Sequence, residues 1–491
     1  MTGTFGSLNI AKTGLQYQQI VIDTTNNNIA NVDTDGYVRR RAVGAELDAA
    51  SEAGAMWSVY TGHGDGVATQ SVQRTTDFLM DSRVRKEQGT LSYLQVQQTS
   101  LERVETAVGE PSDTGVANAL SAFNDAWQDV VTSPDGSAAR QTVIAAGQTL
   151  AGAINTQAQA IDDERAEQRA GAVDDVSKVN VDAGQMAQLN HNIFIAQSNG
   201  TDTSALEDQR DQVALDLAKQ VGATVSVDPT GRFNVSVNGI ALVTGDKAGT
   251  LSLSGINADA TPSNGDTANP SPVSFSITDP VSGASQVIAG ALGGEVGGIT
   301  TLLNVTLSTY RAGLNTLAQQ LAEMVNTQQA QGYDQNGNPG GAFFALGDAA
   351  DPAGTIAVDP TLAANPALVA ASAVAPSASG TANNNADNAD AISQVLRGVE
   401  GAGSMAPVNL GDQYQRLITG LGSMVAGVNS QTTNQQTLAT QVDDEREQQT
   451  GVSLDEETVN LMQAQRAYEA SSRVLSVMDS VLDTLINRTG V

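Results

Sequence analysis

The stretch TTNNNIANVDTDGYVRRR, from Thr24 to Arg41, marks the point where an apolar repeat gives way to a polar turn. Before it, one apolar residue recurs every seven positions: Leu8, Leu15, Ile22 and Ile29. Small or polar residues fill most of the companion positions three residues further on: Ala11, Gln18, Thr25 and Val32. Such a repeat is typical of a helix that packs along a second helix. The stretch therefore predicts the end of a heptad helix, with Ile29 as its last seam residue.

The polar residues of this stretch predict how the helix ends. We interpret Asn26, Asn27 and Asn28 as covering the exposed sides of the last helical turn. The segment from Asn31 to Gly36 then supplies side chains that hydrogen-bond their own backbone in a turn, and Tyr37 anchors the chain as it leaves. Two interpretations stay open for residues 39–41, which are all arginine: a solvated loop, or contacts with acidic neighbours.

The same apolar repeat returns near the other end of the chain. Its main column is Leu461, Tyr468, Leu475 and Leu482, and its companion column is Ala464, Ser471, Met478 and Leu485. Neither terminal helix is apolar enough to be stable alone in water, because isolated helices depend on tertiary packing. Each helix therefore needs a partner. The partner is the other terminal helix, a helix of a neighbouring subunit, or both.

The middle of the chain alternates between helical and strand patterns. Residues 137–197 contain no proline and predict a helix or a helix pair, which unbroken would be about 90 Å long. Apolar residues from Leu303 to Met324 follow spacings of four and three and predict another helix. From Ala223 the period changes to two, with turn signals DPTG and NG, which indicates a strand meander. The Ala/Asn/Asp/Pro-rich segment 349–388 predicts a loop.

These patterns predict an α+β protein, a discontinuous helical rod with a small inserted β domain. The rod combines the N- and C-terminal heptad helices with long central helices. We expect three units: a terminal coiled-coil assembly domain of residues 1–55 plus 440–491, a mainly helical rod domain of residues 56–220 plus 299–439, and a β domain of residues 221–298.

Composition excludes several classes of function. The net charge of -30 repels nucleic acid and anionic membrane surfaces, so neither is an expected partner. The chain lacks cysteine, which excludes disulfides and thiolate metal sites and suits export of an unfolded chain. No apolar run approaches the roughly 20 residues needed to span a bilayer. The first 30 residues also lack the charge and apolar pattern of a signal peptide, so we expect the N-terminus to stay on the mature protein.

The sequence offers little for catalysis, and we predict no enzyme, no cofactor and no metal. The two histidines, His63 and His191, are too few and too far apart in sequence for a histidine metal site. A glycosidase with paired carboxylates is the enzyme alternative, but its clefts need aromatic residues and only 4% of this chain is aromatic. The segment YDQNGNPGG, residues 333–341, imitates a calcium loop, but Ala345 occupies the position of the required glutamate.

Both ends resemble the axial proteins of the bacterial flagellum, which are the rod, hook and hook-associated proteins. The segments that carry the resemblance are SLNIAKTGLQYQQIVIDTTNNNIANVDTDGY and LDEETVNLMQAQRAYEASSRVLSVMDSVLDTLIN. In the middle, SALEDQRDQVALDLAKQVGATVSVD and GALGGEVGGITTLLN are similar to the members at the junction of hook and filament. Two features depart from that pattern: the asparagine triplet, where the signature has a pair, and a short β region that implies a reduced outer domain.

The resemblance implies a structural protein that forms the layer between the flagellar hook and the filament, outside the cell. The implied partners are copies of itself, the hook protein, the second junction protein and a cytoplasmic export chaperone on the C-terminal helix, with type III export. The implied assembly residues are Leu8, Leu15, Ile22, Ile29, Asn27, Asn28, Asn31, Gly36, Tyr37, Leu461, Tyr468, Leu475, Met478, Leu482 and Leu485. The alternatives are another axial protein, of hook or rod, and more distantly a secreted glycan-active enzyme.

Overall fold

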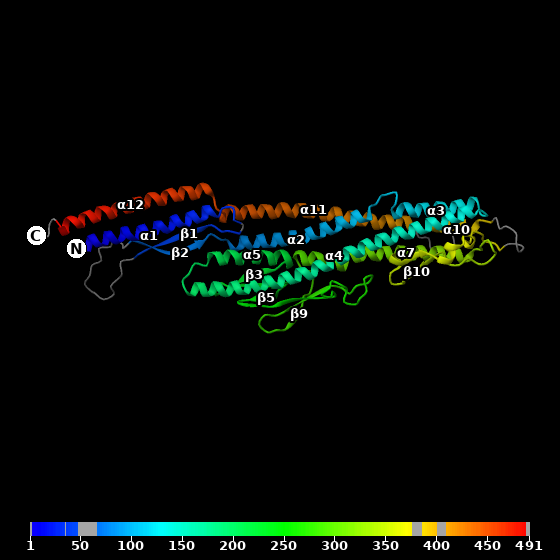
Figure 1. Ribbon diagram of the computed structural model, residues 1–491, viewed down its shortest axis with the longest axis horizontal. Coiled ribbons are helices and arrows are strands. Elements are labelled where there is room, and N and C mark those ends of the chain that lie inside the picture. Colours follow the sequence, from blue (N-terminus) through cyan, green and yellow to red (C-terminus); the bar gives the residue numbers. More distant parts are fainter. Residues whose placement is uncertain (1, 35, 48–65, 376–384, 400–408, 488–491) are drawn as a thin grey trace.

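The computed structural model describes residues 2–34, 36–47, 66–375, 385–399 and 409–487, with side chains described from residue 6 to residue 484. The elements form a long rod, and both chain termini lie at the same end of it (Figure 1). The unit at this end consists of helix α1 (Thr2–Ala30), strands β1 (Arg40–Glu46) and β2 (Val67–Arg74), and helix α12 (Leu454–Asn487). The predicted end of the first heptad helix, next to Ile29, is confirmed.

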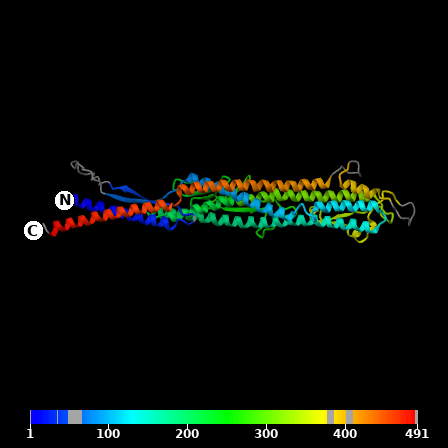
Figure 2. The ribbon, with the colours of Figure 1, turned by 90° about the horizontal axis from the view of Figure 1, so that it is seen from above.

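Helices build most of the rest of the molecule, and the long ones run along the rod axis (Figures 1 and 2). They are α2 (Phe78–Val108), α3 (Val116–Thr132), α4 (Ser137–Ser198), α5 (Ser204–Val221), α6 (Gly294–Thr301), α7 (Leu307–Gln331), α10 (Asp387–Leu396) and α11 (Leu410–Thr450). The predicted α+β helical rod with an inserted β region is confirmed. Antiparallel neighbours α2 and α11 form one side of the rod, and the Gln88 amide donates to Asp443 across them.

Helix α4 is one helix of 62 residues, which settles the choice between a single helix and a pair. The segment SPDG separates it from α3, as its turn residues predict. Two glycines within it, Gly171 and Gly184, favour a break by their low helix propensity but do not interrupt it. A Cβ at Gly171 would lie 3.5 Å from the side chain of Ile299, and nothing lies within 4 Å of one at Gly184. The helical turns before and after each glycine therefore override its low helix propensity.

Two hydrophobic cores lie along α4. The distal core joins the first half of α4 to α3, α7, α10 and α11, and it contains a cluster of four buried rings: Phe123, Trp127, Phe343 and Phe344. A Cβ at Gly147 of α4 would lie 2.7 Å from the Phe343 ring, so a glycine is needed for this ring to reach the helix. The second core joins the other half of α4 to α5, α6 and the β domain.

The β domain consists of two antiparallel sheets with strand orders β3-β4-β5-β6 and β7-β8-β9. Their strands are β3 (Thr224–Val227), β4 (Phe233–Val237), β5 (Ile240–Thr244), β6 (Lys247–Ala248), β7 (Thr250–Ser254), β8 (Ser274–Thr278) and β9 (Ser285–Val287). The predicted meander is confirmed, and Asn238 and Gly239 both have positive φ, as a tight hairpin turn requires. Alternate residues of β4, such as Val235, face the core.

A π-helical turn, η1 (Leu302–Thr306), connects α6 to α7. The predicted apolar helix is confirmed beyond it, since Leu307, Leu314 and Leu321 are buried in the distal core. Leu303, by contrast, belongs to the second core. The extra residue of a π-turn rotates the face of the helix, so one apolar repeat serves two different cores.

The prediction of a loop for residues 349–388 is wrong for most of the described part. Short elements fill it and complete the far end of the rod: α8 (Pro352–Thr355), β11 (Ile356–Val358), α9 (Pro360–Ala364) and η2 (Pro366–Leu368). Strand β11 pairs with β10 (Phe344–Leu346). Asp351 and Asp359 cap the two short helices with their side chains. Composition suggested a loop, but aspartate before proline is also a helix start.

The structure suggests other domain boundaries than the sequence. Helix α11 passes residue 440 unbroken and stays packed on α2, and the chain bends only at residues 451–453. Strand β2 packs with α1 and β1, although it lies beyond residue 55. We therefore propose that the terminal unit comprises residues up to 74 together with residues from 454 onward. Among the described helices, none is both long and apolar enough to cross a membrane.

Candidate assembly site at the paired chain ends

Helices α1 and α12 lie side by side, and their contacts fix an antiparallel pairing (Figures 1 and 2). Asn28 lies opposite Glu457, and Gly14 lies opposite Ser471, 3.5 Å from where a Cβ at this glycine would be. Strand β1 covers another side of α1, where the Tyr17 ring contacts Gly44. The terminal unit is therefore a helix pair supported by a hairpin.

Asn28 is the centre of this unit, with 1% of its surface exposed. Its amide nitrogen donates to the Arg40 carbonyl oxygen at 2.8 Å and to Glu457 Oε2 at 2.9 Å. Its amide oxygen accepts from the Arg40 N–H at 3.0 Å and from the Tyr37 hydroxyl at 2.9 Å. One side chain thus joins the end of α1, the start of β1 and the start of α12.

Glu457 brings a charge into this centre, and its carboxylate is fully paired. Besides Asn28, it accepts from Arg39 Nε at 2.8 Å, and Arg39 also reaches Glu456 at 2.8 Å. Only 3% of the Glu457 side chain is exposed. Loss of one partner from a buried, hydrogen-bonded ion pair is strongly destabilising, since the remaining charge stays in a poorly solvated place. This cluster therefore fixes α12 against the turn that follows α1.

A second charge cluster joins the terminal unit to the rod. Arg40 lies 3.0 Å from Asp208 of α5, and Arg74 of β2 contacts Asp208 at 2.7 Å and Asp211 at 2.6 Å. Burial raises the pKa of the Asp208 carboxyl, against the opposing effect of the two guanidinium groups. For Arg74, burial acts to lower the pKa, but Asp211 and its acidic neighbours outweigh it and the pKa is raised.

These contacts decide the open question about residues 39–41 within a single chain. Arg39 and Arg40 make ion pairs with acidic groups far away in the sequence, and the Arg40 guanidinium lies 5.0 Å from the centre of the Tyr37 ring. Arg41 is exposed on β1. A solvated loop is therefore the wrong interpretation for the first two arginines.

The asparagines divide in a way that the sequence did not predict. Asn26 and Asn27 are exposed, as expected, but Asn28 is buried, so its assignment to the exposed side of the helix is wrong. Asn31 donates to the carbonyl oxygen of Asn27 at 2.9 Å, and Gly36 has φ +76°, which confirms the turn. The reason for the error is that Asn28 bonds to residues 12 and 429 positions away, which no local pattern reveals.

The predicted seam between the terminal helices is only partly covered. Fully buried apolar residues on these helices are the small ones, Ala11 and Ala464, with 6% and 3% exposed. The larger predicted seam residues with described side chains are half-buried: Leu8, Leu15, Ile22, Ile29, Leu461, Leu475, Met478 and Leu482. Tyr468 is exposed, and the side chain of Leu485 lies outside the described residues. The helix pair therefore leaves much of its apolar surface in solvent.

Helix α12 also carries a second apolar face. Several of its residues are exposed and lie within about a third of a turn of one another in helical projection. These are Val459, Met462, Val474, Val477 and Val481. Beside them, a groove of about 930 Å³ opens between α1, β1 and α12, with Arg41 and Val459 among its lining residues. An apolar stripe of this kind on a surface helix marks an interaction site.

The other candidates from the sequence do not gather into a site. His191 lies on the surface of α4, with 55% of its side chain exposed, 3.7 Å from Asp246, and His63 lies outside the described residues. Asp334 is buried, and its carboxylate accepts from the backbone N–H groups of Asn336 and Asn338, which confirms a turn in place of a calcium loop. In the described part of the chain, no group of three or more acidic or histidine side chains could hold a metal.

Sequence reasoning missed the acidic partners of the arginines. Glu207, Asp208 and Asp211 of α5 and Glu456 and Glu457 of α12 lie in two short acidic segments, EDQRD and DEE. The sequence features that could have pointed to these ion pairs are the two acidic segments and the run of arginines at residues 39–41. With a net charge of -30, however, acidic segments are common along this chain and do not single out these two.

Comparison with known proteins shows that both ends and the middle of the chain match families of flagellar proteins. The family model of the flagellar hook-associated protein FlgK helical domain matches residues 101–344. The models of the flagella basal body rod protein and of the flagellar basal body rod FlgEFG protein C-terminal region match residues 8–37 and 447–488. The chain is also 29% identical to flagellar hook-associated protein 1 of Bacillus subtilis, over 100% of this chain and 99% of that relative.

The chain belongs to the family of flagellar hook-associated protein 1. The relative from Escherichia coli is 26% identical over 98% of this chain and 99% of its own length. The relative from Salmonella typhimurium is 30% identical over 69% of this chain and 59% of its own length. The flagellar hook junction protein FlgK from Burkholderia pseudomallei has a solved structure that shares the fold, with a TM-score of 0.63, 18% identity, and coverage of 76% of this chain and 100% of that one. As a member of the hook-associated protein 1 family, the chain is a structural protein of the flagellum.

Proposed function

We propose that this protein forms the layer that joins the flagellar hook to the filament, and that subunits join through the paired chain ends. The observation that carries the proposal is the half-covered seam between α1 and α12, together with the second apolar face of α12. A neighbouring helix pair would cover both surfaces. At roughly 25 cal/mol per Å² of apolar surface removed from water, such burial favours assembly without strengthening the single chain.

The charge clusters give this layer a defined joint. Arg39 with Glu457 holds α12 against the turn, and Arg74 with Asp208 and Asp211 holds the hairpin against the rod. These bonds lie within one chain, so the angle between the terminal unit and the rod is set before neighbours arrive. In our proposal, exposed groups that remain at the joint, including Asn27 and Arg41, meet the next subunit.

The neighbours in this proposal are copies of the chain, the hook protein and the second junction protein. The unfolded chain passes through the flagellar type III apparatus to the outside of the cell, and an export chaperone covers α12 before export. The absence of cysteine supports this route, because an unfolded chain without thiols cannot cross-link on the way. The exposed apolar face of α12 supports a chaperone that binds this helix in the cytoplasm.

The test is complementation of a strain that lacks the gene, followed by electron microscopy. Without the protein we expect hooks that carry no filament, and flagellin released as monomers. The full-length protein should restore filaments. If the deletion removes hooks as well, the protein is another axial component, of rod or hook. Normal flagella in the deletion strain would contradict a structural role at the junction.

The same strain tests the assembly surface. Leu475→Asp places a carboxylate in the half-buried seam. A carboxylate that stays there without a partner costs on the order of several kcal/mol. We expect a folded rod but no filament. Ser472→Asp adds the same charge at an exposed position of α12 and is the matched control. Filaments with Leu475→Asp would show that this seam is not the joint between subunits.

The second candidate function is that of an axial protein of the flagellar rod or hook, because both chain ends match family models of basal body rod proteins. These models cover the segments that build α1 and α12. The middle of the chain, matched by the FlgK helical domain over residues 101–344, favours the junction. A purified protein that caps isolated hooks in vitro would support the junction, whereas incorporation along the shaft would support the alternative.

A further inference from the structure

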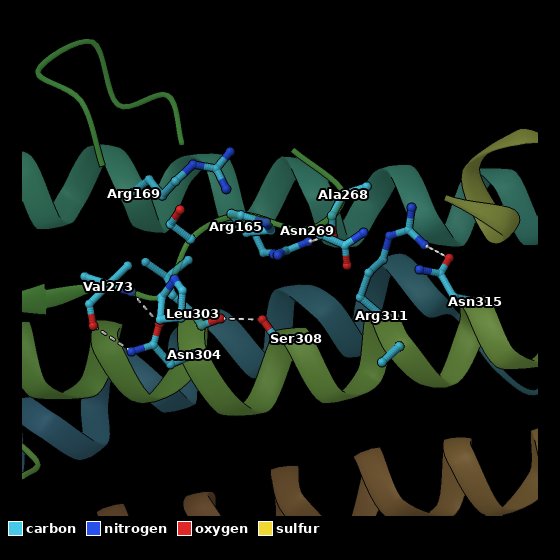
Figure 3. A pocket seen from close by; sticks show the side chains of 14 residues that line it. Arg165, Arg169, Ala268, Asn269, Val273, Leu303, Asn304, Ser308, Arg311 and Asn315 are labelled. Carbon is cyan, nitrogen blue, oxygen red and sulfur yellow. Dashed lines mark hydrogen bonds between the residues drawn. The ribbon is translucent and has the colours of Figure 1, made fainter. Parts of the chain in front are cut away.

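A pocket of about 270 Å³ lies between α4, α7 and the segment that leads into β8 (Figure 3). Arg165 and Arg169 reach it from α4, and Arg311 reaches it from α7. Among the described residues that line the pocket, these three arginines are the only charged ones. The whole chain carries 54 acidic residues against 24 basic ones, so a lining with arginine and without carboxylate runs against the composition.

The three arginines are buried, with 2%, 5% and 2% of their surface exposed for Arg165, Arg169 and Arg311. A buried guanidinium needs acceptors, because transfer of an unpaired charge from water is costly. Arg311 has them: it contacts Asp162 at 3.2 Å and also donates to Asp351. Arg165 shares Asp162 at 3.0 Å. Two carboxylates thus serve two of the three arginines from outside the pocket.

Arg169 is the arginine without a carboxylate among the described residues. Its Nε donates a hydrogen bond to the carbonyl oxygen of Ala260, at 3.1 Å. Arg165 donates from Nη1 to the carbonyl oxygens of Thr267 and Ala268 at 3.3 Å, but its buried Nε has no hydrogen-bond partner in the part of the chain that the structure describes. Burial, and then the neighbouring charge of Arg165, lower the pKa of the Arg169 guanidinium, while the more distant Asp162 acts in the opposite direction.

The backbone around the pocket supports a site where the β domain meets the rod. The π-helical turn η1 lies at its edge, and such turns often occur at functional sites. Within it, Asn304 exchanges two hydrogen bonds of 2.8 Å with the backbone of Val273, at the entry to β8. Pocket walls therefore come from the rod on one side and from the β domain on the other.

We propose that this pocket binds a small tetrahedral oxyanion of the phosphate or sulfate class, held by Arg169 with support from Arg165. Planar guanidinium groups with several N–H donors match the oxygens of such an anion better than any other side chain. The bound anion joins α4 to the segment 257–273 and ties the β domain to the rod. This site is independent of the assembly role of the chain ends.

The experiment uses the full-length monomer, with inorganic phosphate, sulfate, acetate or chloride added at equal ionic strength. Hydrogen exchange of the segment 257–273 and the melting temperature are the measurements. Phosphate and sulfate at saturation should slow exchange in this segment about tenfold and raise the melting temperature by about 2 °C relative to chloride. A direct titration of phosphate by calorimetry gives the stoichiometry, which should be one per chain.

Arg169→Gln should abolish the protection, while Arg103→Gln removes an exposed arginine of the rod and should keep it. If Arg169→Gln fails to fold, Ser308→Asp serves instead, because it adds a carboxylate to the pocket wall. Equal protection by chloride, or by phosphate in both the Arg169→Gln and the wild-type chain, overturns the proposal. Protection by acetate equal to that by phosphate overturns the tetrahedral class and assigns a carboxylate site.

Discussion

The two ends of this rod are both built from helices but differ in how completely their apolar residues are buried. At the distal end, the rings of Phe123 and Trp127 are fully buried among α3, α4, α7 and α10. At the end that holds the termini, the large seam residues are half-buried, and Val477 on the opposite face of α12 is 61% exposed. Stability at the distal end comes from hydrophobic packing, while order at the terminal end depends on polar contacts around Asn28.

This difference separates folding from assembly. A closed core gives a rod that folds alone, whereas in the proposed assembly the open helix pair keeps apolar surface for neighbours and is fully buried only in the layer. The polar contacts fix the direction of the terminal helices without covering them. The predictions below test whether substitutions in the two regions have the different effects that this comparison requires.

Phe343→Ala should give the largest loss of stability. The ring is fully buried among aromatic neighbours and touches the backbone of α4 at Gly147, so its removal leaves a cavity. We expect a loss of about 3–5 kcal/mol in the free energy of unfolding, measured by guanidinium denaturation of the monomer. A loss below about 1 kcal/mol would show that the distal core is no tighter than the chain ends.

Asn28→Ala should have an intermediate and local effect. It removes four hydrogen bonds and leaves the Arg40 N–H and the Glu457 carboxylate short of a partner. We expect a local cost of about 2 kcal/mol, seen as a roughly 30-fold faster hydrogen exchange in β1 and at the start of α12. Asn27→Ala, at an exposed neighbouring position, is the control and should change little. Similar exchange in both variants would argue against the centre described above.

Tyr414→Phe tests a buried polar contact of the rod. The Tyr414 hydroxyl accepts from Gln157 at 2.6 Å and donates to Glu110 at 2.9 Å, and burial raises the pKa of this tyrosine well above its usual value of 10. The folded chain therefore keeps the proton that the unfolded chain loses above pH 10, so stability is present below pH 10 and falls as pH rises further.

We expect Tyr414→Phe to cost about 1 kcal/mol at neutral pH and to make the decline above pH 10 less steep. The measurement is a set of denaturation curves at pH values from about 8 to about 11.5, a range that brackets the ordinary tyrosine pKa of about 10. Burial raises the pKa of Tyr310 as well, so part of the slope should remain. An unchanged slope would contradict the role assigned to Tyr414.

Leu475→Ala should have the smallest effect on the monomer. Since Leu475 is half-buried, we expect a loss below about 1 kcal/mol and little amide protection at Leu15 and Leu475 in the free chain. Protection should rise strongly in the assembled layer. Strong protection of both amides in the monomer would mean that the terminal pair is already complete without neighbours.

The sequence predicted those parts whose signals are local and repeated. The apolar repeats predicted α1, α12 and α7, and the segment SPDG predicted the corner between α3 and α4. The turn signal at Asn238 predicted the hairpin. It did not predict the unbroken course of α4, because packing of Gly171 against Ile299 is tertiary. Nor did it predict the short helices at residues 352–364, where capping by Asp351 and Asp359 outweighs a loop-like composition.

The candidate site shows the same division. The turn around Gly36 and the anchoring of Tyr37 followed from turn chemistry, and both are present. The partners of Asn28, Arg39 and Arg74 come from elements 130 or more positions away, apart from the local bonds of Asn28. Periodicity carries no information about such pairs, so the buried centre and the bridge to α5 were beyond reach.

Helix α4 contributes its first half to one hydrophobic core and its second half to the other. Fraying of this helix at either core removes the support of the next turns, so the two cores are expected to lose structure as one cooperative unit. In the export route proposed above, the chain would therefore have few partly folded forms in which it could become trapped. Because α4 belongs to both cores, completion of this single helix commits the distal rod and the β domain to folding together.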